Sequence, residues 1–106
     1  MPADAAFQEH VMGLLTHVEG VTSRPMFGGY GIFQDGDMFA LIAGSALFFK
    51  VDDSNLAAYE QAGSTRYKPM PYYSVPADVM EDTDKFNEWA ATSIAIGHAT
   101  AKKKKK

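Results

Sequence analysis

Apolar residues near the N-terminus recur at the spacing of one helix face, at positions i, i+4, i+7, i+8 and i+11. These positions are Phe7, Val11, Leu14, Leu15 and Val18. Asp4 can cap the start of this helix, and Gly20 can end it. We therefore predict an N-terminal helix whose apolar face packs against the rest of the chain.

Strand periodicity replaces helix periodicity in the next segment. We predict antiparallel strands over Arg24–Phe33, Asp37–Ala43 and Ala46–Val51. Asp35-Gly36 lies between the first two, and this dipeptide tolerates the positive φ that a tight hairpin turn requires. The middle strand is apolar on both of its alternating faces. It is therefore expected at the centre of the sheet, with other groups packed on each side.

Three glycines, Gly28, Gly29 and Gly31, interrupt the first of these strands. A Gly-x-Gly pattern also occurs in nucleotide-binding loops, but here it leads into more strand and not into a helix N-terminus that would offer amides to a phosphate. Glycine has no side chain, so it permits a close approach or a bend of the backbone. We predict that these glycines serve packing.

The C-terminal half alternates short helices with extended segments. Asp52–Ser54 predicts the start of a short helix over Leu56–Glu60, and Gly63 predicts its end. Residues 66–69 and 71–76 have the composition of two short strands or extended segments. Their prolines restrict them to the edges of a sheet.

The last helix is predicted to begin at Asp82–Asp84, after a short turn that starts near Asp78. An arc of this helix is apolar and wide enough to bury, and it consists of Phe86, Trp89, Ala90, Ile94 and Ile96. We predict that Trp89 is buried against the sheet. The predicted order is helix, three strands, helix, two strands, helix, which is an α+β fold.

The length of 106 residues suits one domain and is too short for two. No stretch approaches the roughly 18 apolar residues of a membrane span, and the N-terminus has neither the basic nor the apolar part of a secretory leader. The chain has no cysteine, which excludes disulfides and cysteine-ligated metal clusters. We therefore predict a cytoplasmic protein of bacterial type that does not contact a membrane.

Basic residues are unevenly distributed along the chain. Residues 1–101 carry five basic against thirteen acidic residues, because the other five basic residues are Lys102, Lys103, Lys104, Lys105 and Lys106. An acidic body repels phosphate backbones, whereas a basic terminal run is typical of a disordered electrostatic tail. We predict one domain over residues 1–101 and a disordered tail over 102–106 that binds nucleic acid only weakly.

Residues for catalysis do not form a recognisable pattern. There is no cysteine nucleophile, and no serine lies in a Gly-x-Ser-x-Gly turn. The carboxylates fall at turns and helix starts, where capping and dipole effects account for them. His10 and His17 lie about 10 Å apart along a helix axis, so they do not share a metal ion. We therefore predict no enzyme activity, no cofactor and no metal site.

Aromatic residues offer a candidate interaction site. Most of them can pack in the core, but Tyr72 and Tyr73 point to opposite sides of one extended segment, so at least one lies near the surface. Tyrosine and arginine are enriched where proteins dock. We name Arg24, Tyr30, Tyr72 and Tyr73 as the candidate interaction patch, with plain packing as the alternative.

Several ordered blocks of the chain resemble one protein family. They are Met-Phe-Gly-Gly-Tyr-Gly-Ile-Phe at 26–33, Asp35-Gly36, Met38-Phe39-Ala40, Leu47-Phe48-Phe49-Lys50-Val51 and Tyr72-Tyr73-Ser74-Val75-Pro76. Together they resemble the N-terminal domain of the TfoX/Sxy competence regulators, from about Phe7 to Trp89. Full-length members of that family have a second, C-terminal helical domain, which this chain is too short to contain.

The resemblance implies a curved antiparallel sheet of about five strands with helices packed on it. It also implies a protein-interaction module that contacts another protein, such as a transcription regulator, in the control of natural transformation genes. Two alternatives stay open: direct non-specific nucleic-acid binding through the lysine tail, and a small ligand-binding protein or enzyme that uses the cleft between sheet and helices. The oligomeric state also stays open.

Overall fold

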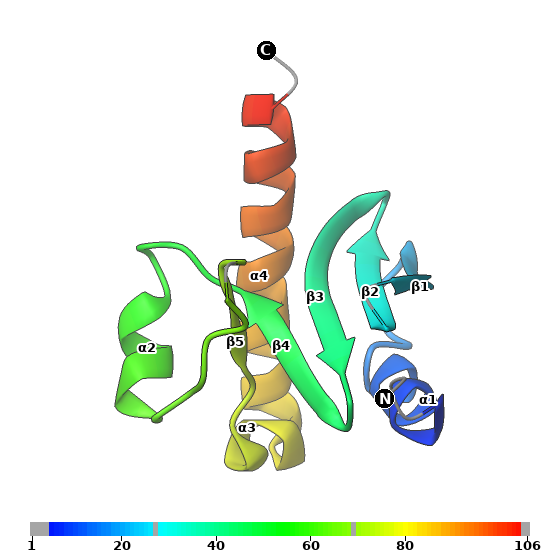
Figure 1. Ribbon diagram of the computed structural model, residues 1–106, viewed down its shortest axis with the longest axis horizontal. Helices are drawn as coiled ribbons and strands as arrows, with labels where there is room; N and C mark the ends of the chain where they lie inside the picture. The colour runs from blue at the N-terminus through cyan, green and yellow to red at the C-terminus, as the bar shows by residue number, and fades with distance from the viewer. Residues whose placement is uncertain (1–4, 27, 69, 105–106) are drawn as a thin grey trace.

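The computed structural model describes residues 5–26, 28–68 and 70–104. The helices are α1 (Ala5–Leu14), α2 (Leu56–Gln61), α3 (Ala77–Glu81) and α4 (Thr83–Lys104). The strands are β1 (Val21–Met26), β2 (Gly29–Gln34), β3 (Asp37–Ala43), β4 (Ala46–Lys50) and β5 (Tyr72–Ser74). They form one open, antiparallel, five-stranded sheet in the order β1-β2-β3-β4-β5, and β3 curves strongly (Figure 1). The α+β class and the five-stranded sheet are thus confirmed.

The first predicted strand, Arg24–Phe33, is two strands, so four strands and not three precede α2. β1 begins earlier than expected, at Val21, and Gly28 lies between β1 and β2 with a φ of 73°. Glycine adopts this left-handed conformation without steric cost, so the chain reverses direction here and does not continue as one strand. The bend that the glycines permit is therefore a full turn.

The two strands predicted at 66–69 and 71–76 are reduced to one, β5. Arg66 makes only an isolated antiparallel bridge to Tyr73. Two backbone bonds hold this segment beside β5: Tyr67 N–H donates to the carbonyl of Tyr72 at 2.7 Å, and Ser74 N–H donates to Thr65 at 2.9 Å. The prolines near the segment remove donors that a longer ladder would need.

The N-terminal helix is shorter than its apolar pattern, which runs to Val18, whereas α1 ends at Leu14. Leu15 and Val18 continue the buried side in turns that follow the helix, and Gly20 has a φ of 81° where the chain enters β1. Asp4, the predicted cap, lies outside the described residues. The short helix after β4 is confirmed, and Gly63 ends it with a φ of 75°.

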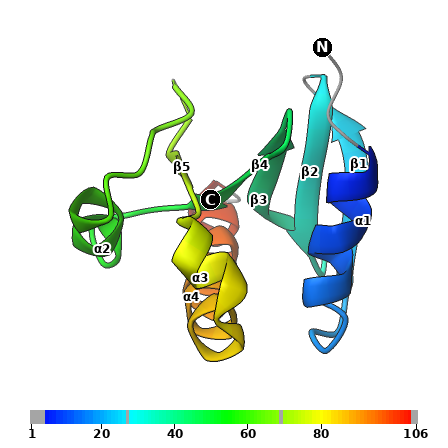
Figure 2. The ribbon, with the colours of Figure 1, turned by 90° about the horizontal axis from the view of Figure 1, so that it is seen from below.

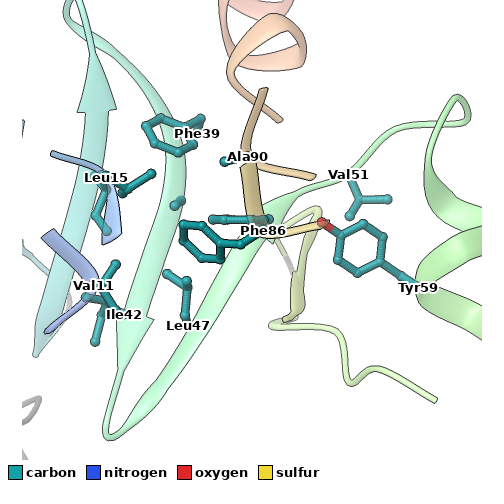
Figure 3. Close-up of a cluster of buried hydrophobic side chains, with 12 residues drawn as sticks. Val11, Leu15, Phe39, Ile42, Leu47, Val51, Tyr59, Phe86 and Ala90 are labelled. Atoms are coloured by element: carbon teal, nitrogen blue, oxygen red, sulfur yellow. The ribbon is translucent and has the colours of Figure 1, made fainter. Parts of the chain in front are cut away.

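One face of the sheet carries the main hydrophobic core (Figure 3). Phe49 lies at its centre, with its ring centroid 6.2 Å from that of Phe39 and 5.7 Å from that of Phe86. The sheet contributes Ile32, Phe39, Ala40, Ile42, Leu47 and Phe49, and the helices and connections contribute Val11, Leu15, Val51, Tyr59, Phe86 and Ala90. α1 and α2 lie at opposite ends of the sheet, with α4 between them (Figure 2).

The other face of the sheet is also covered at its centre. Leu41 is only 1% exposed, and its cross-strand neighbours are Gly31 and Phe48. The side chains of Met26 and Phe33 fill the space beside Gly31. This arrangement confirms that β3 is central and packed on both faces, although side chains of the sheet and not a second helix layer cover Leu41.

Two contacts hold the C-terminal half of α4 to the sheet. A Cβ atom on Gly97 would lie 2.7 Å from the carbonyl oxygen of Met38, so only glycine allows this approach of helix to strand. The next residue, His98, places Nδ1 2.6 Å from Asp37 Oδ2 and Nε2 2.5 Å from Gln34 Oε1. The β2–β3 hairpin and α4 are therefore joined by both backbone packing and side-chain hydrogen bonds.

We predict that Gly29→Ala lowers the free energy of unfolding by about 1–3 kcal/mol, because the added Cβ would collide with the carbonyl oxygen of Ile42 in the neighbouring strand. Gly13→Ala is the matched control, since Gly13 is exposed in α1 and nothing lies within 4 Å of its added Cβ. Alanine is favoured over glycine in helices by up to about 1 kcal/mol, so the control should be at least as stable as the parent chain. Urea unfolding measures both, and unchanged stability in Gly29→Ala would contradict the close approach.

Candidate interaction surfaces

The structure does not bring the four residues of the predicted patch together. Arg24 lies on β1 opposite Gly31, and Tyr30 lies on β2 opposite Pro25. The two residues therefore belong to neighbouring cross-strand pairs and not to the same pair. Tyr72 and Tyr73 lie on β5 at the opposite edge of the sheet. Successive residues of a strand point to opposite faces, so Arg24 and Tyr30 also face away from each other.

Most of these aromatic rings serve packing. Tyr72 is 2% exposed, and the Lys50 ammonium lies 5.0 Å from the centre of its ring. Burial raises the pKa of the Tyr72 hydroxyl to about 12. Tyr73 is half-buried, with its ring centroid 6.1 Å from that of Tyr59. Of the four residues, only Arg24 is well exposed, and its guanidinium carbon lies 4.6 Å from the centre of the Phe33 ring.

A groove between α2 and α4 brings together residues that the sequence did not mark as a site. Trp89 on α4 and Tyr59 on α2 meet with ring centroids 4.5 Å apart. Trp89 is half-buried, and two cavities of about 380 and 340 Å³ open on either side of it. Both cavities are lined by Ala58, Glu88 and Trp89. We call this region the α2–α4 groove.

The prediction that Trp89 is buried against the sheet is wrong. The stripe of α4 that faces the sheet consists of Phe86, Ala90, Ser93 and Gly97, at i, i+4, i+7 and i+11. Two of these residues are not apolar in the usual sense, since one is a serine and one a glycine. The buried side of α4 predicted from hydrophobicity alone was therefore displaced around the helix axis toward Trp89. Trp89 lies beside the true buried stripe and faces α2.

Two buried hydroxyl groups lie behind the groove. Ser93 is fully buried, and its Oγ donates a hydrogen bond to the carbonyl of Lys50 at 2.8 Å. The Tyr59 side chain extends from α2 toward the core, with its hydroxyl oxygen directed away from solvent (Figure 3). Burial raises the pKa of the Tyr59 hydroxyl, and the Ser93 hydroxyl opposes part of that rise. Tyr59 thus stays a neutral phenol that fixes α2 to the core.

The described residues hold no group of three or more His, Asp or Glu side chains placed to bind a metal ion. His10 lines a different groove, beside Phe7 and Met80, and His17 is exposed. No helix in the described ranges combines the length and the hydropathy needed to cross a membrane.

The lysine-rich end of the chain is in part helical. α4 continues through Lys104, so three residues of the predicted disordered tail, 102–104, are helical. Lys105 and Lys106 lie outside the described residues.

Comparison with known proteins gives one family match. A model described as the TfoX N-terminal domain matches residues 13–96 of the 106-residue chain. The matched range contains all five strands, α2, α3 and the part of α4 that lines the groove. None of the curated proteins compared with the chain matches it.

We predict that Trp89→Ala lowers the free energy of unfolding by about 1–2 kcal/mol, because a half-buried ring loses only part of its apolar contact. Phe86→Ala is the comparison in the same helix, and it should cost about 3–5 kcal/mol since Phe86 is 1% exposed in the core. Chemical denaturation of the two variants measures the difference. A loss in Trp89→Ala as large as that in Phe86→Ala would contradict the placement of Trp89 beside the buried stripe.

We predict that stability falls as the pH rises from 10 to 12. In the folded state the Tyr72 hydroxyl keeps its proton up to a pKa of about 12, while in the unfolded chain it loses the proton near the ordinary tyrosine pKa of 10.0. The contribution of the protonated Tyr72 hydroxyl to the free energy of unfolding is therefore fully present below pH 10. About 2 kcal/mol of it is lost by pH 12. Tyr72→Phe should reduce this alkaline loss in denaturation curves at pH 8, 10 and 11, and the part that remains comes from Tyr59, whose pKa burial also raises. An alkaline loss that Tyr72→Phe leaves unchanged would contradict the assignment.

Proposed function

Because the chain belongs to the TfoX N-terminal domain family, we propose that it is a non-catalytic protein-interaction module that acts in the control of natural transformation genes by contacting a transcription regulator. We place the contact at the α2–α4 groove. The observation that carries this placement is the half-buried Trp89 between two cavities.

The groove has the composition of a docking site. Tryptophan and tyrosine dominate the binding energy of protein interfaces, particularly where an aromatic ring is flanked by space that a partner side chain can fill. Glu88 lines both cavities and is exposed, so it can select a partner by charge. Tyr59 is held rigidly from behind, which reduces the ordering cost of binding.

The same groove offers little for catalysis. Apart from the buried Tyr59 hydroxyl, its hydroxyl groups come from Ser54 and Thr92, and each is engaged locally. Ser54 Oγ donates to Asp52 Oδ1 at 2.5 Å, and Thr92 Oγ1 donates to the carbonyl of Glu88 at 3.1 Å. No histidine, cysteine or lysine lines the larger cavity, and its one carboxylate, Glu88, is exposed. This arrangement supports binding over bond-breaking chemistry.

The proposal predicts that purified chain retains a transcription regulator from the native cytoplasm, and that the groove mediates the contact. Glu88→Lys should abolish retention, because it reverses the charge shared by both cavities while leaving the core intact. Glu9→Lys is the matched control, since it makes the same charge change at an exposed position on α1. Mass spectrometry identifies the retained proteins for all three baits.

Direct binding to the purified regulator then locates the contact. Trp89 is the only tryptophan in the chain, so its fluorescence reports on the groove without added labels. We expect the emission of Trp89 to shift to shorter wavelength as the partner excludes water. Equal binding by the Glu88→Lys and Glu9→Lys variants, or binding without a change in Trp89 emission, would move the contact elsewhere.

A further inference from the structure

The two edges of the sheet are not equivalent. The outer edge of β5 is covered by its own chain, through the backbone bonds that Thr65 and Tyr67 make with Ser74 and Tyr72. β1 ends the sheet on the other side, and within residues 5–26, 28–68 and 70–104 no strand or backbone hydrogen bond occupies its outer edge. An uncovered edge presents a row of N–H and C=O groups that pairs readily with another strand.

The backbone bonds identify which groups of β1 point outward. Asp35 N–H donates to the carbonyl of Gly20 at 3.0 Å, so Gly20 faces β2. In an antiparallel ladder this orientation alternates, so Thr22 and Arg24 also face β2 while Val21, Ser23 and Pro25 face outward. Pro25 has no N–H, which is consistent with its outward position. The outer edge therefore offers two donors, the N–H groups of Val21 and Ser23.

We propose that β1 pairs antiparallel with β1 of a second copy of this chain, so that two five-stranded sheets join across a two-fold axis at Thr22. In this register Val21 of one copy lies opposite Ser23 of the other. Each such pair exchanges two N–H···O=C bonds, so all outward donors of both copies are used. This surface is separate from the α2–α4 groove, and the proposal does not depend on the groove.

Two further features favour this register. Pro25 falls outside the hydrogen-bonded pairs, so its missing N–H leaves no carbonyl of the ladder without a donor. A register moved by one residue along each strand also forms four bonds, but it places Pro25 opposite Val21, whose carbonyl then has no donor. The register also sets Thr22 opposite Thr22 of the second copy, and cross-strand threonine pairs are favourable in antiparallel sheets.

Charge complementarity favours a second copy over an unrelated strand. In the proposed register Arg24 lies opposite Gly20 of the other copy. The Asp35 carboxylate occupies the space where a side chain of Gly20 would be. Arg24 of each copy therefore meets Asp35 of the other, which gives two symmetric ion pairs at the ends of the ladder. The acidic bodies repel each other, and these pairs offset the repulsion locally.

The covered edge at β5 limits the size of the assembly. A chain with two open edges can add copies without end, whereas a chain with one open edge closes at two. We therefore expect a dimer and no larger species.

Sedimentation equilibrium of the full chain over a concentration series tests the proposal. Ser23→Pro removes the outward N–H and should weaken the dimer on the order of thirtyfold, since two of its four backbone bonds are lost. The ladder to β2 does not use that N–H, so circular dichroism should show an intact fold. Ser23→Ala is the matched control: both variants lose the 2.7 Å bond from Gln8 Nε2 to Ser23 Oγ, but alanine keeps the backbone donor and should still form the dimer.

Two more measurements locate the interface. Hydrogen exchange at the amides of Val21 and Ser23 should slow as the protein concentration rises. Arg24→Gln and Asp35→Asn should each weaken the dimer about fivefold, and the double variant should lose little more than either single change. A chain that is monomeric up to about 1 mM, a dimer that Ser23→Pro leaves unchanged, or equal loss in both Ser23 variants would overturn the proposal.

Discussion

The backbone of α4 touches the backbone of β3 at Gly97, and the positions of the other elements depend on this contact. The helix can lie this close because neither partner has a side chain in the way, and the strand meets it where a bulge between Ile32 and Phe33 shifts the register. The bulge leaves Phe39 without a partner in β2 and directs its ring into the core. With α4 set at this distance, Phe86 reaches Phe49, His98 reaches the hairpin, and Trp89 turns toward α2.

Sequence periodicity predicted the elements that depend on local chemistry. The Asp35-Gly36 turn, the Gly63 helix end and the central place of β3 follow from positive φ or from apolar alternation, and the structure has all three. The sequence predictions were wrong where contacts between residues far apart in the chain determine the local structure. Gly28 marks a turn and not a bend, because the partner for β1 is β2 itself. Gly97 carried no signal, since a helix-interior glycine has no local property that reveals the strand beside it.

The candidate site shows the same division. Aromatic and basic residues were grouped by composition, but the order of strands separates Arg24 from Tyr72 and Tyr73 by the width of the sheet. Trp89 was assigned to the core because hydrophobic ranking overlooks Ser93, whose hydroxyl is satisfied by the carbonyl of Lys50. A buried serine on a helix is visible only when its acceptor is known. The groove therefore required the tertiary structure.

The long helix α4 fixes the distance between the groove and the lysine residues near its C-terminus. α4 passes without interruption from Trp89 in the groove to Lys102 near its end, thirteen residues later, which is about 20 Å at the rise of an α-helix. Gly97 and His98 clamp the intervening turns to the sheet, so the helix cannot bend between these points. α4 is therefore rigid over this span. Any molecule that binds at Trp89 lies at a fixed distance and angle from Lys102.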